Sequence, residues 1–340
     1  MRRTSQNYEE DMVRTSYYLN DIIQGKKLPP LYSDVIAKII FDPDKHPDRL
    51  EFLLRAITGD DTIRVDKSSR NEGSRKSEQS KGMIFDIPVW LMDRRLANME
   101  FQKSAQNYIL KRGEIYSSDL LLIEYSAEKG HKKGEVSFDN VASVIVLVLL
   151  VESPQMFLDY DRYSDHYIHR FEKMTADSGL SYDPLVKIIY IQLDKCLRQL
   201  RRGYNAEEAH GKSDELQLWL SSIADINDYC VRRMTEGNVQ LQSIQDELHI
   251  LSQDKEVQAM ITAEELTRMD YYSAKSEARK LGLAEGREAG LAEGRNSEVF
   301  SSVQAGDYSL RRGMEKLHLN EIEFRRKAKA AGYDLDHIKG

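Results

Sequence analysis

The sequence has few of the residues that mark secreted or membrane proteins. Among its 340 residues are only two cysteines, Cys196 and Cys230, which are too few for a disulfide framework and lack CxxC spacing. The longest apolar run, residues 141–151, is too short to cross a bilayer. The arginines near the start are followed by no apolar stretch of the kind found in a signal peptide. We therefore expect a cytoplasmic protein with no membrane segment.

An excess of positive charge is also lacking. The net charge of −7 argues against a protein whose whole surface is basic, although it leaves room for a local basic patch. An apolar fraction of 41% is too high for a chain that is disordered throughout. The length alone suggests about two domains. Charge by itself does not decide between nucleic-acid and other partners.

The stretch at residues 81–102, KGMIFDIPVWLMDRRLANMEFQ, organises the rest of the chain. Its pattern predicts a β-hairpin with strands at 83–91 and 96–102, joined by a tight charged turn. Because strand residues alternate in direction, Asn98, Glu100 and Gln102 share one face and Met99 and Phe101 the other. Asp86 lies among apolar residues, where an ionised carboxylate is costly without a cation.

The register of the hairpin decides whether these polar side chains meet. Asp86 lies opposite Glu100 if paired residue numbers sum to 186, and opposite Gln102 if they sum to 188. A two-residue loop at Asp93 and Arg94 gives a sum of 187 and places Asp86 opposite Phe101 instead. The hypothesis of a shared site therefore needs an odd-numbered loop or a bulge.

Two carboxylates beside an amide on one sheet face predict a site for a hard divalent cation such as Mg²⁺. The pattern of Asp86 followed by Glu100-x-Gln102 resembles the motif of PD-(D/E)XK nucleases. More specifically, it is similar to the recombination-promoting nuclease and putative transposase family, in which Gln replaces the usual Lys. The resemblance implies that Asp86, Glu100 and Gln102 are catalytic, with Mg²⁺ or, as a second choice, Mn²⁺ as the cofactor.

The helix expected from residue 34 has a further acidic candidate for the site, Asp34, in its first turn. Asp34 has an ordinary explanation there, because a carboxylate is favourable at a helix N-terminus, and Ser33 is the candidate N-cap. The stretches 34–41 and 50–59 also resemble the opening helices of the family, although Ala37 stands where the family usually has Phe. The resemblance implies that Asp34 faces the metal and that Lys38 helps to bind substrate.

Later segments extend the resemblance in the same order. Tyr108, Arg112 and Tyr116 line one face of a helix predicted from residue 103, and Arg112 is the candidate phosphate contact. Buried strands are expected at 136–151 and 185–193, and Lys195 ends a run similar to the one that closes the family's core. His166 and His169 are spaced for a metal site on a helix, but no third ligand is evident and surface histidines are the better interpretation.

From residue 214 onward the pattern is helical. The short repeat at 282–297, GLAEGREAGLAEGRNS, resembles the Gly-rich tail common in the family. Because glycine weakens a lone helix, pairing with a second copy is expected, which makes the protein a homo-oligomer through this C-terminal helical region. We expect a polar segment at 1–30, a nuclease-like core at 31–205, a helical extension at 206–275 and a helical Gly/Glu/Arg-rich tail at 276–340.

The sequence thus predicts an α/β protein with a restriction-endonuclease-like core, a central mixed sheet flanked by helices, and a C-terminal helical extension. The resemblance implies a metal-dependent DNA endonuclease linked to recombination or transposition. Two alternatives remain open: a catalytically inactive DNA-binding accessory protein, and an oligomeric scaffold assembled by the tail.

Overall fold

The computed structural model describes residues 19–66, 86–131, 140–204, 214–335 and 337–338. They belong to two compact units, one within Arg14–Glu265 and one within Leu266–Gly340. The helices of the first unit that the structure describes over their whole length are α2 (Asp34–Ile40), α3 (Pro47–Thr58), α4 (Ile109–His131), α5 (Gln155–Tyr160), α6 (Leu193–Gly203), α7 (Glu215–Ala224), α8 (Tyr229–Met234) and α9 (Val239–Gln253). The helix α10 (Lys255–Gln304) begins in the first unit and continues into the second, which also holds α11 (Leu310–Leu317) and α12 (Glu321–Ala330).

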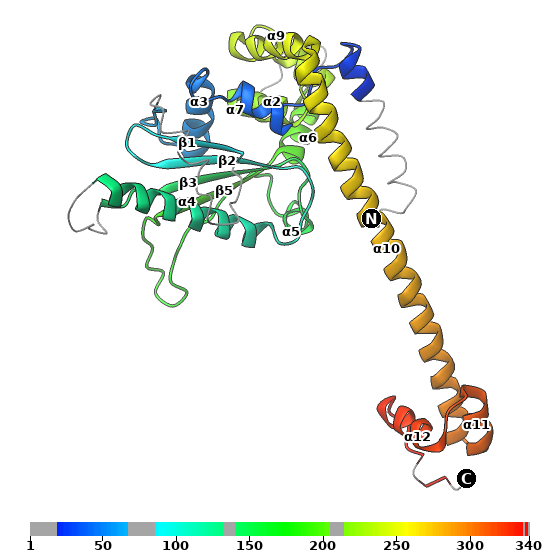
Figure 1. The fold of residues 1–340 in the computed structure, drawn as a ribbon. Helices are drawn as coiled ribbons and strands as arrows, with labels where there is room; N and C mark the ends of the chain where they lie inside the picture. Colours follow the sequence, from blue (N-terminus) through cyan, green and yellow to red (C-terminus); the bar gives the residue numbers. More distant parts are fainter. Residues whose placement is uncertain (1–18, 67–85, 132–139, 205–213, 336, 339–340) are drawn as a thin grey trace. The chain divides into compact units, whose positions relative to one another are not determined.

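A mixed sheet is the centre of the first unit (Figure 1). Its described strands are β1 (Ile87–Trp90), β2 (Leu96–Gln102), β3 (Val144–Leu150), β4 (Ile168–Arg170) and β5 (Val186–Gln192). They lie in the order β1-β2-β3-β5-β4. The pairs β2/β3 and β3/β5 are parallel, whereas β1 and β4 run antiparallel to their neighbours at the two edges. The predicted central mixed sheet flanked by helices is confirmed.

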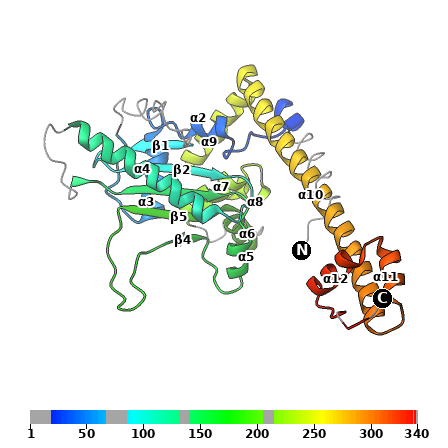
Figure 2. The same cartoon turned by 60° about the horizontal axis from the view of Figure 1, so that its bottom comes forward.

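Alternation along each strand gives the sheet two different apolar faces. In β2, Ala97, Met99 and Phe101 pack into a cluster with α2, α3 and α7, whereas Leu96 belongs to a second cluster with α4. Figures 1 and 2 show α2, α3 and α7 on one side of the sheet and α4 across the other. β3, with the sequence VIVLVLL, is buried along its whole length because helices cover both faces. Glu100 and Gln102 therefore point toward the α4 side.

Several predicted boundaries shift by a few residues. The strand expected at 83–91 is observed from Ile87, and residues 83–85 lie outside the described part of the chain. The strand expected at 136–151 is described from Val144, and β5 begins and ends one residue inside the expected range. The helix expected from residue 103 begins only at Ile109. The second opening helix, α3, ends at Gly59, whose positive φ of 77° suits a glycine C-cap.

The C-terminal helices of the first unit pack directly on the sheet. Trp219 and Leu220 of α7, Leu241 and Ile244 of α9, and Ile261 of α10 share one apolar cluster with α2, α3 and the sheet. The helical character predicted from residue 214 is confirmed, and the helices complete the core that the strands begin. The expected domain boundaries at 205 and 275 stay predictions.

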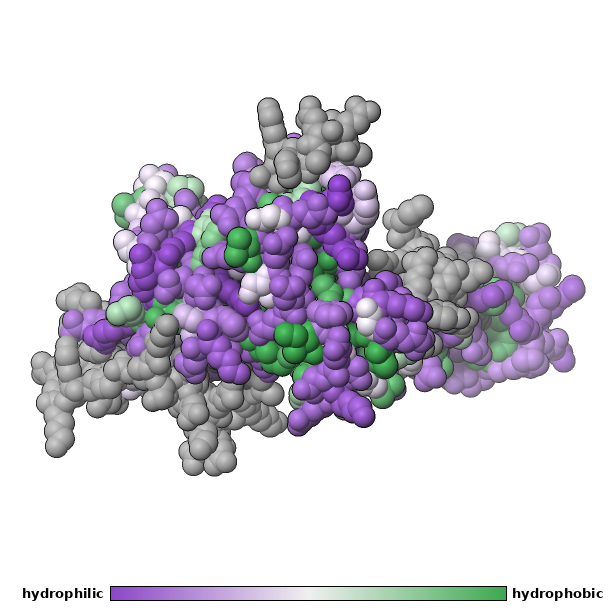
Figure 3. Space-filling view, turned by 90° about the horizontal axis from the view of Figure 1, so that it is seen from above, coloured by the Kyte–Doolittle hydropathy of each residue, from purple (hydrophilic) through white to green (hydrophobic). Residues whose placement is uncertain are grey.

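The second unit has an apolar cluster of its own. Val299 and Phe300, near the end of α10, pack with Leu310 of α11 and Phe324 of α12. Gly313 lies so close to this cluster that an added Cβ would approach Phe324 to 2.9 Å, so α11 needs glycine at this point. Among the described residues no helix is both long and apolar enough to cross a membrane. The surface seen in Figure 3 is mostly hydrophilic, with apolar patches between the polar residues.

Candidate active site

The register of the β1/β2 hairpin brings the two predicted carboxylates together. Ile87 pairs with Met99 and Trp90 with Leu96, so paired residue numbers sum to 186. The Leu91 N–H donates to the Arg95 carbonyl at 2.9 Å, which leaves a three-residue loop whose last member, Arg94, has a left-handed φ of 75°. The predicted odd-numbered loop is confirmed. Asp86, just before β1, therefore lies opposite Glu100.

Hydrogen bonds from the backbone hold the two side chains, which we call the acidic pair. The Asp86 Oδ2 accepts from the Phe101 N–H at 2.7 Å, and the Glu100 Oε1 accepts from the Asp86 N–H at 3.3 Å. Glu100 is only 5% exposed and also accepts from the Asn98 Nδ2 at 2.5 Å. Within the described part of the chain, neither carboxylate forms an ion pair with Lys, Arg or His.

Burial makes both members of the acidic pair hard to ionise. The pKa of Asp86 is raised from 3.8 to about 6, mainly by burial and in smaller part by the nearby charge of Asp34, although the hydrogen bond from Phe101 opposes this change. Burial likewise raises the pKa of Glu100 from 4.5 to about 7, with a further contribution from Asp86. Two neighbouring carboxyls with raised pKa values are a common feature of sites that bind a cation or transfer protons.

The donors of this site are those that a hard divalent cation prefers. The acidic pair and the Gln102 side chain offer oxygen atoms, which suit Mg²⁺ or Mn²⁺ better than Zn²⁺, whose sites use Cys and His. Among the described residues no group of three or more His, Cys, Asp or Glu side chains is placed to hold a metal. The charged ligands of the candidate site are thus two carboxylates, and water or phosphate would complete the coordination of the cation. The oxygen donors of the site fit Mg²⁺.

Gln102 ends β2 and is almost fully buried at 7% exposure. Its Nε2 donates to the Ser104 carbonyl at 3.0 Å, which turns the amide nitrogen toward the residues that follow the strand. The Oε1 is then the end of the side chain that can accept a hydrogen bond from a bound water. A neutral amide in this position adds no positive charge to the acidic pair.

Asp34 lies in the first turn of α2, as expected, but its carboxylate is paired with a lysine. The Asp34 Oδ1 is 2.8 Å from the Lys103 Nζ, and the Asp34 side chain is 49% exposed. Asp34 is still near enough to raise the pKa of Asp86. The N-cap position of Ser33 is confirmed, but the predicted capping bond is not formed. Instead the Ser33 Oγ donates to Glu264 at 2.6 Å.

The two predicted substrate contacts lie at the border of the site. Arg112 in α4 places its guanidinium 4.7 Å from the centre of the Tyr116 ring and favours the charged form of Glu100. Lys38 in α2 is exposed and favours the charged form of Asp86. The two cations thus reach the acidic pair electrostatically from different helices.

Three residues near the acidic pair were not singled out from the sequence. Asn98 was placed on the same strand face, but its hydrogen bond to Glu100 depends on the side-chain rotamer. Lys103 follows the Glu-x-Gln motif directly, and that adjacency was the available signal. Glu264, which contacts Lys103, is far away in the sequence, and no local pattern marks it.

A second polar cluster lies at the same carboxyl edge of the sheet, because Gln102, Leu150 and Gln192 are paired across β2, β3 and β5. We call it the paired cluster, and its members are Ser153, Asp161, Gln192, Asp194, Lys195 and Arg198. Asp161 is 3.0 Å from the Lys195 Nζ and 3.2 Å from Arg198, and Asp194 is 3.0 Å from Arg198. Each carboxylate in it has a cation.

The histidines at 166 and 169 do not form the helical metal site that their spacing allowed. His169 lies in the short strand β4, and its Nε2 is 2.8 Å from the Gln192 Oε1. The two histidines are not on a helix, because residues 168–170 pair with β5. The preference against a metal role for these two histidines is consistent with this geometry.

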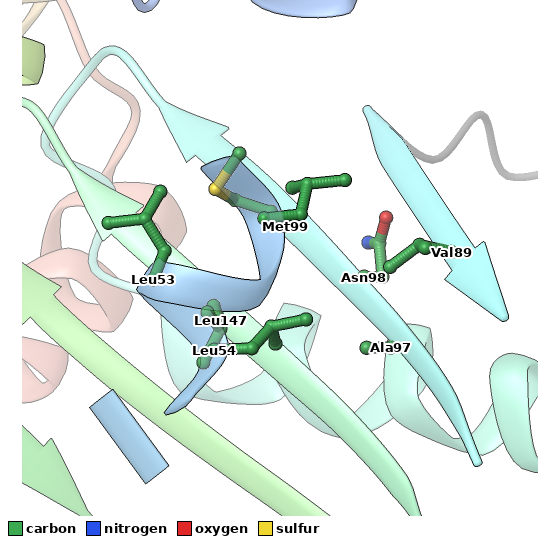
Figure 4. A pocket seen from close by; sticks show the side chains of 8 residues that line it. Leu53, Leu54, Val89, Ala97, Asn98, Met99 and Leu147 are labelled. Atoms are coloured by element: carbon green, nitrogen blue, oxygen red, sulfur yellow. The ribbon is translucent and has the colours of Figure 1, made fainter. Parts of the chain in front are cut away.

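A small cavity on the other face of the sheet has no chemical function that we can assign. It lies between α3 and the sheet, and Figure 4 shows the apolar side chains of Leu53, Leu54, Ala97, Met99 and Leu147 around it. The acidic pair points to the opposite face. The candidate active site is therefore the carboxylate pair and not this cavity.

Comparison with known proteins supplies the family. No curated protein and no solved structure matches the chain. A model of the PD-(D/E)XK nuclease family transposases matches residues 31–278, which include the whole hairpin, all five strands and the helices through the first half of α10. The restriction-endonuclease-like arrangement of the sheet agrees with this match. The chain therefore belongs to the family of PD-(D/E)XK nuclease transposases.

Proposed function

We propose that the protein is a Mg²⁺-dependent endonuclease that hydrolyses phosphodiester bonds in DNA during recombination or transposition. The observation that carries the proposal is the hairpin register, which places Asp86 opposite Glu100 at the carboxyl end of β2. The family is one of nucleases that generally use divalent metal ions and act on DNA. A buried and a partly buried carboxyl, without an ion-pair partner among the described residues, are a poor choice for stability alone, which supports a role in binding.

Asp86 and Glu100 would hold the cation through their carboxylate oxygens. When bound, Mg²⁺ supplies an activated water and neutralises charge on the scissile phosphate. Gln102 would accept a hydrogen bond from that water through its Oε1 and so orient it. Because Gln102 carries no charge, it cannot favour a hydroxide as a lysine would. Slow turnover at neutral pH is the expected consequence.

Three further residues have supporting roles in this proposal. Asp34 is the additional acidic residue, and it would reach the cation through the carboxylate oxygen that does not contact Lys103. Arg112 and Lys38 would contact the phosphate backbone, since both are cations that reach the acidic pair from the flanking helices. Their positions on α4 and α2 would place phosphates on two sides of Asp86 and Glu100.

The test is cleavage of supercoiled plasmid DNA with Mg²⁺ or Mn²⁺ by the wild type and by Asp86→Ala. We expect the wild type to nick the plasmid and Asp86→Ala to lose at least about a hundredfold in rate, as the loss of a metal ligand does. Equal thermal unfolding curves would show that the variant is folded. Equal cleavage by both proteins refutes the site, and metal-independent DNA binding without cleavage by the wild type indicates an accessory protein instead.

We also propose that the protein is a homo-oligomer through its C-terminal helical region. Residues 277–295 of α10 are exposed along the helix, and the repeat places Gly282, Gly286, Gly290 and Gly294 at every fourth residue. A lone helix of this composition is weak, and a second copy would shield its backbone. Light scattering should give a mass above that of the monomer of 39.3 kDa for the full chain, and a monomeric mass would contradict the proposal.

A further inference from the structure

Lys103 stands at a junction of three elements beside the acidic pair. It follows β2 directly, and its Nζ is 2.8 Å from the Asp34 Oδ1 at the start of α2. The same nitrogen donates to the Glu264 Oε1 of α10. Its side chain is only 20% exposed. A lysine ammonium has three donors and no acceptor, so two carboxylates can hold it in a defined position.

Glu264 is the other centre of this junction. Besides Lys103, its carboxylate accepts from the Ser33 Oγ at 2.6 Å and from the Asp34 N–H at 3.1 Å. It therefore occupies the N-terminus of α2 in place of the capping bond that Ser33 does not make. Although burial opposes its charge, Lys103 outweighs that effect and lowers the pKa of Glu264. The carboxylate is ionised at neutral pH.

Packing of α10 aims Glu264 at this point. Val257 and Ile261 lie in the apolar cluster of the first unit, and Glu264 follows them at helical spacing on the same side of the helix. Ser33, its partner, is 3% exposed. The position of Glu264 is thus set by buried contacts of α10 and not by the ion pair alone.

We propose that Glu264 and Lys103 are positioning residues of the acidic site. Glu264 anchors Lys103 and the first turn of α2, and Lys103 in turn holds the Asp34 carboxylate beside Asp86. The first turns of α10 then belong to the active site, although they lie far outside its motif in the sequence. This inference rests on the proposed function, because it assigns the junction to a cation-binding site.

The charge balance of the junction predicts the direction of the effect. Glu264→Gln removes one negative charge and leaves Lys103 with Asp34 as its remaining anionic partner among the described residues. Because like charges repel, the freed ammonium disfavours a dication nearby. Removing a residue that supports metal ligands typically weakens metal binding roughly 10- to 100-fold. We expect about a tenfold weaker affinity for Mn²⁺.

The experiment measures Mn²⁺ binding by electron paramagnetic resonance at pH 8 in the full chain. The variants are Glu264→Gln, Lys103→Arg, which keeps the charge, and Glu256→Gln as a matched control. Glu256 is exposed in the first turn of the same helix α10. We expect Glu264→Gln to bind Mn²⁺ about tenfold more weakly, Lys103→Arg to stay near the wild type, and the control to match it.

A second measurement separates positioning from folding. In the metal-free protein, amide hydrogen exchange at Asp34 should accelerate in Glu264→Gln, because its N–H exchanges a charged acceptor for a neutral and weaker one. The thermal unfolding curve shows whether the variant is folded. A folded Glu264→Gln with faster exchange but unchanged Mn²⁺ affinity overturns the proposal and leaves a structural ion pair. Unchanged exchange overturns it as well.

The outcomes also distinguish this inference from the proposed function. If the wild type binds no Mn²⁺, or if Asp86→Ala binds it equally well, the metal site itself is refuted, and the positioning role falls with it. If the wild type binds Mn²⁺ through Asp86 and Glu264→Gln binds equally well, only the present inference fails.

Discussion

Two polar clusters at the same edge of one sheet differ in whether their carboxylates are paired with cations. In the paired cluster, Asp161 and Asp194 each lie within 3.2 Å of a cation. In the acidic pair, Asp86 and Glu100 are held by backbone and amide N–H groups, and burial raises both pKa values. A buried charge is normally neutralised by a partner within the protein. The difference teaches that cation partners mark the structural cluster, whereas deeper burial without an ion-pair partner among the described residues marks the candidate binding site.

The largest expected effect on stability comes from breaking the paired cluster. Asp161→Ala leaves the Lys195 ammonium, whose side chain is 7% exposed, with only the carbonyls of Ser164 and His166 as acceptors among its remaining described partners. Removing one member of a buried ion pair costs about 3 kcal/mol. Urea unfolding should show this loss of free energy of unfolding.

If the paired cluster and the acidic pair are separate, Asp161→Ala should leave the binding of Mn²⁺ unchanged. At a temperature where the variant is folded, its half-saturating Mn²⁺ concentration should equal that of the wild type. If Mn²⁺ binding weakens as much as it does in Asp86→Ala, the two clusters are one functional site, and the paired cluster is not purely structural.

A smaller effect is expected from the acidic pair, and it depends on pH. Asp86 and Glu100 have raised pKa values in the folded protein, of about 6 and about 7, against 3.8 and 4.5 for the free groups. Between those limits the folded protein keeps protons that the unfolded chain has lost, so the stability of the metal-free protein falls as the pH rises. Glu100→Gln should flatten this decline and stabilise the metal-free protein at pH 8 by about 2 kcal/mol.

The same groups set the pH dependence of metal binding in the opposite sense. A carboxylate must lose its proton before it binds a cation, so the half-saturating Mg²⁺ concentration for cleavage should fall as the pH rises from about 6 to about 8. Because the two carboxyls interact, the profile reports the pair and not either residue. Plasmid nicking at several Mg²⁺ concentrations and pH values measures it, and a flat profile would contradict the role of the pair.

Much of the hairpin could be predicted because the information is local. The range of β2 was predicted at its observed limits, Leu96–Gln102, and the need for an odd-numbered loop follows from alternation along the strands. The choice between the sums 186 and 188 depended on the turn. A three-residue loop with Arg94 in a left-handed conformation sets the sum to 186, and the charged sequence of the turn did not predict this conformation.

The surroundings of the site could be predicted less well because they depend on distant segments. Asp34 was placed correctly in the first turn of a helix, but its pairing with Lys103 joins residues from α2 and the end of β2. Glu264 comes from α10, where a glutamate on a helix has no local feature that marks it as buried and paired. The periodicity of the C-terminal helices predicted that they are helical, but only the structure shows that α7, α9 and the start of α10 complete the apolar core.

By itself the sequence determined the strands, the flanking helices and the family, because alternation, helical periodicity and a short motif are properties of neighbouring residues. Only the tertiary structure decided which carboxylates have a cation. That depends on which side chains from separate elements reach the same few ångströms, and the free energy of a buried charge changes steeply over that distance. Asp86 and Asp161 are the same residue type at one sheet edge, and the burial and the partners that the fold gives them make them different.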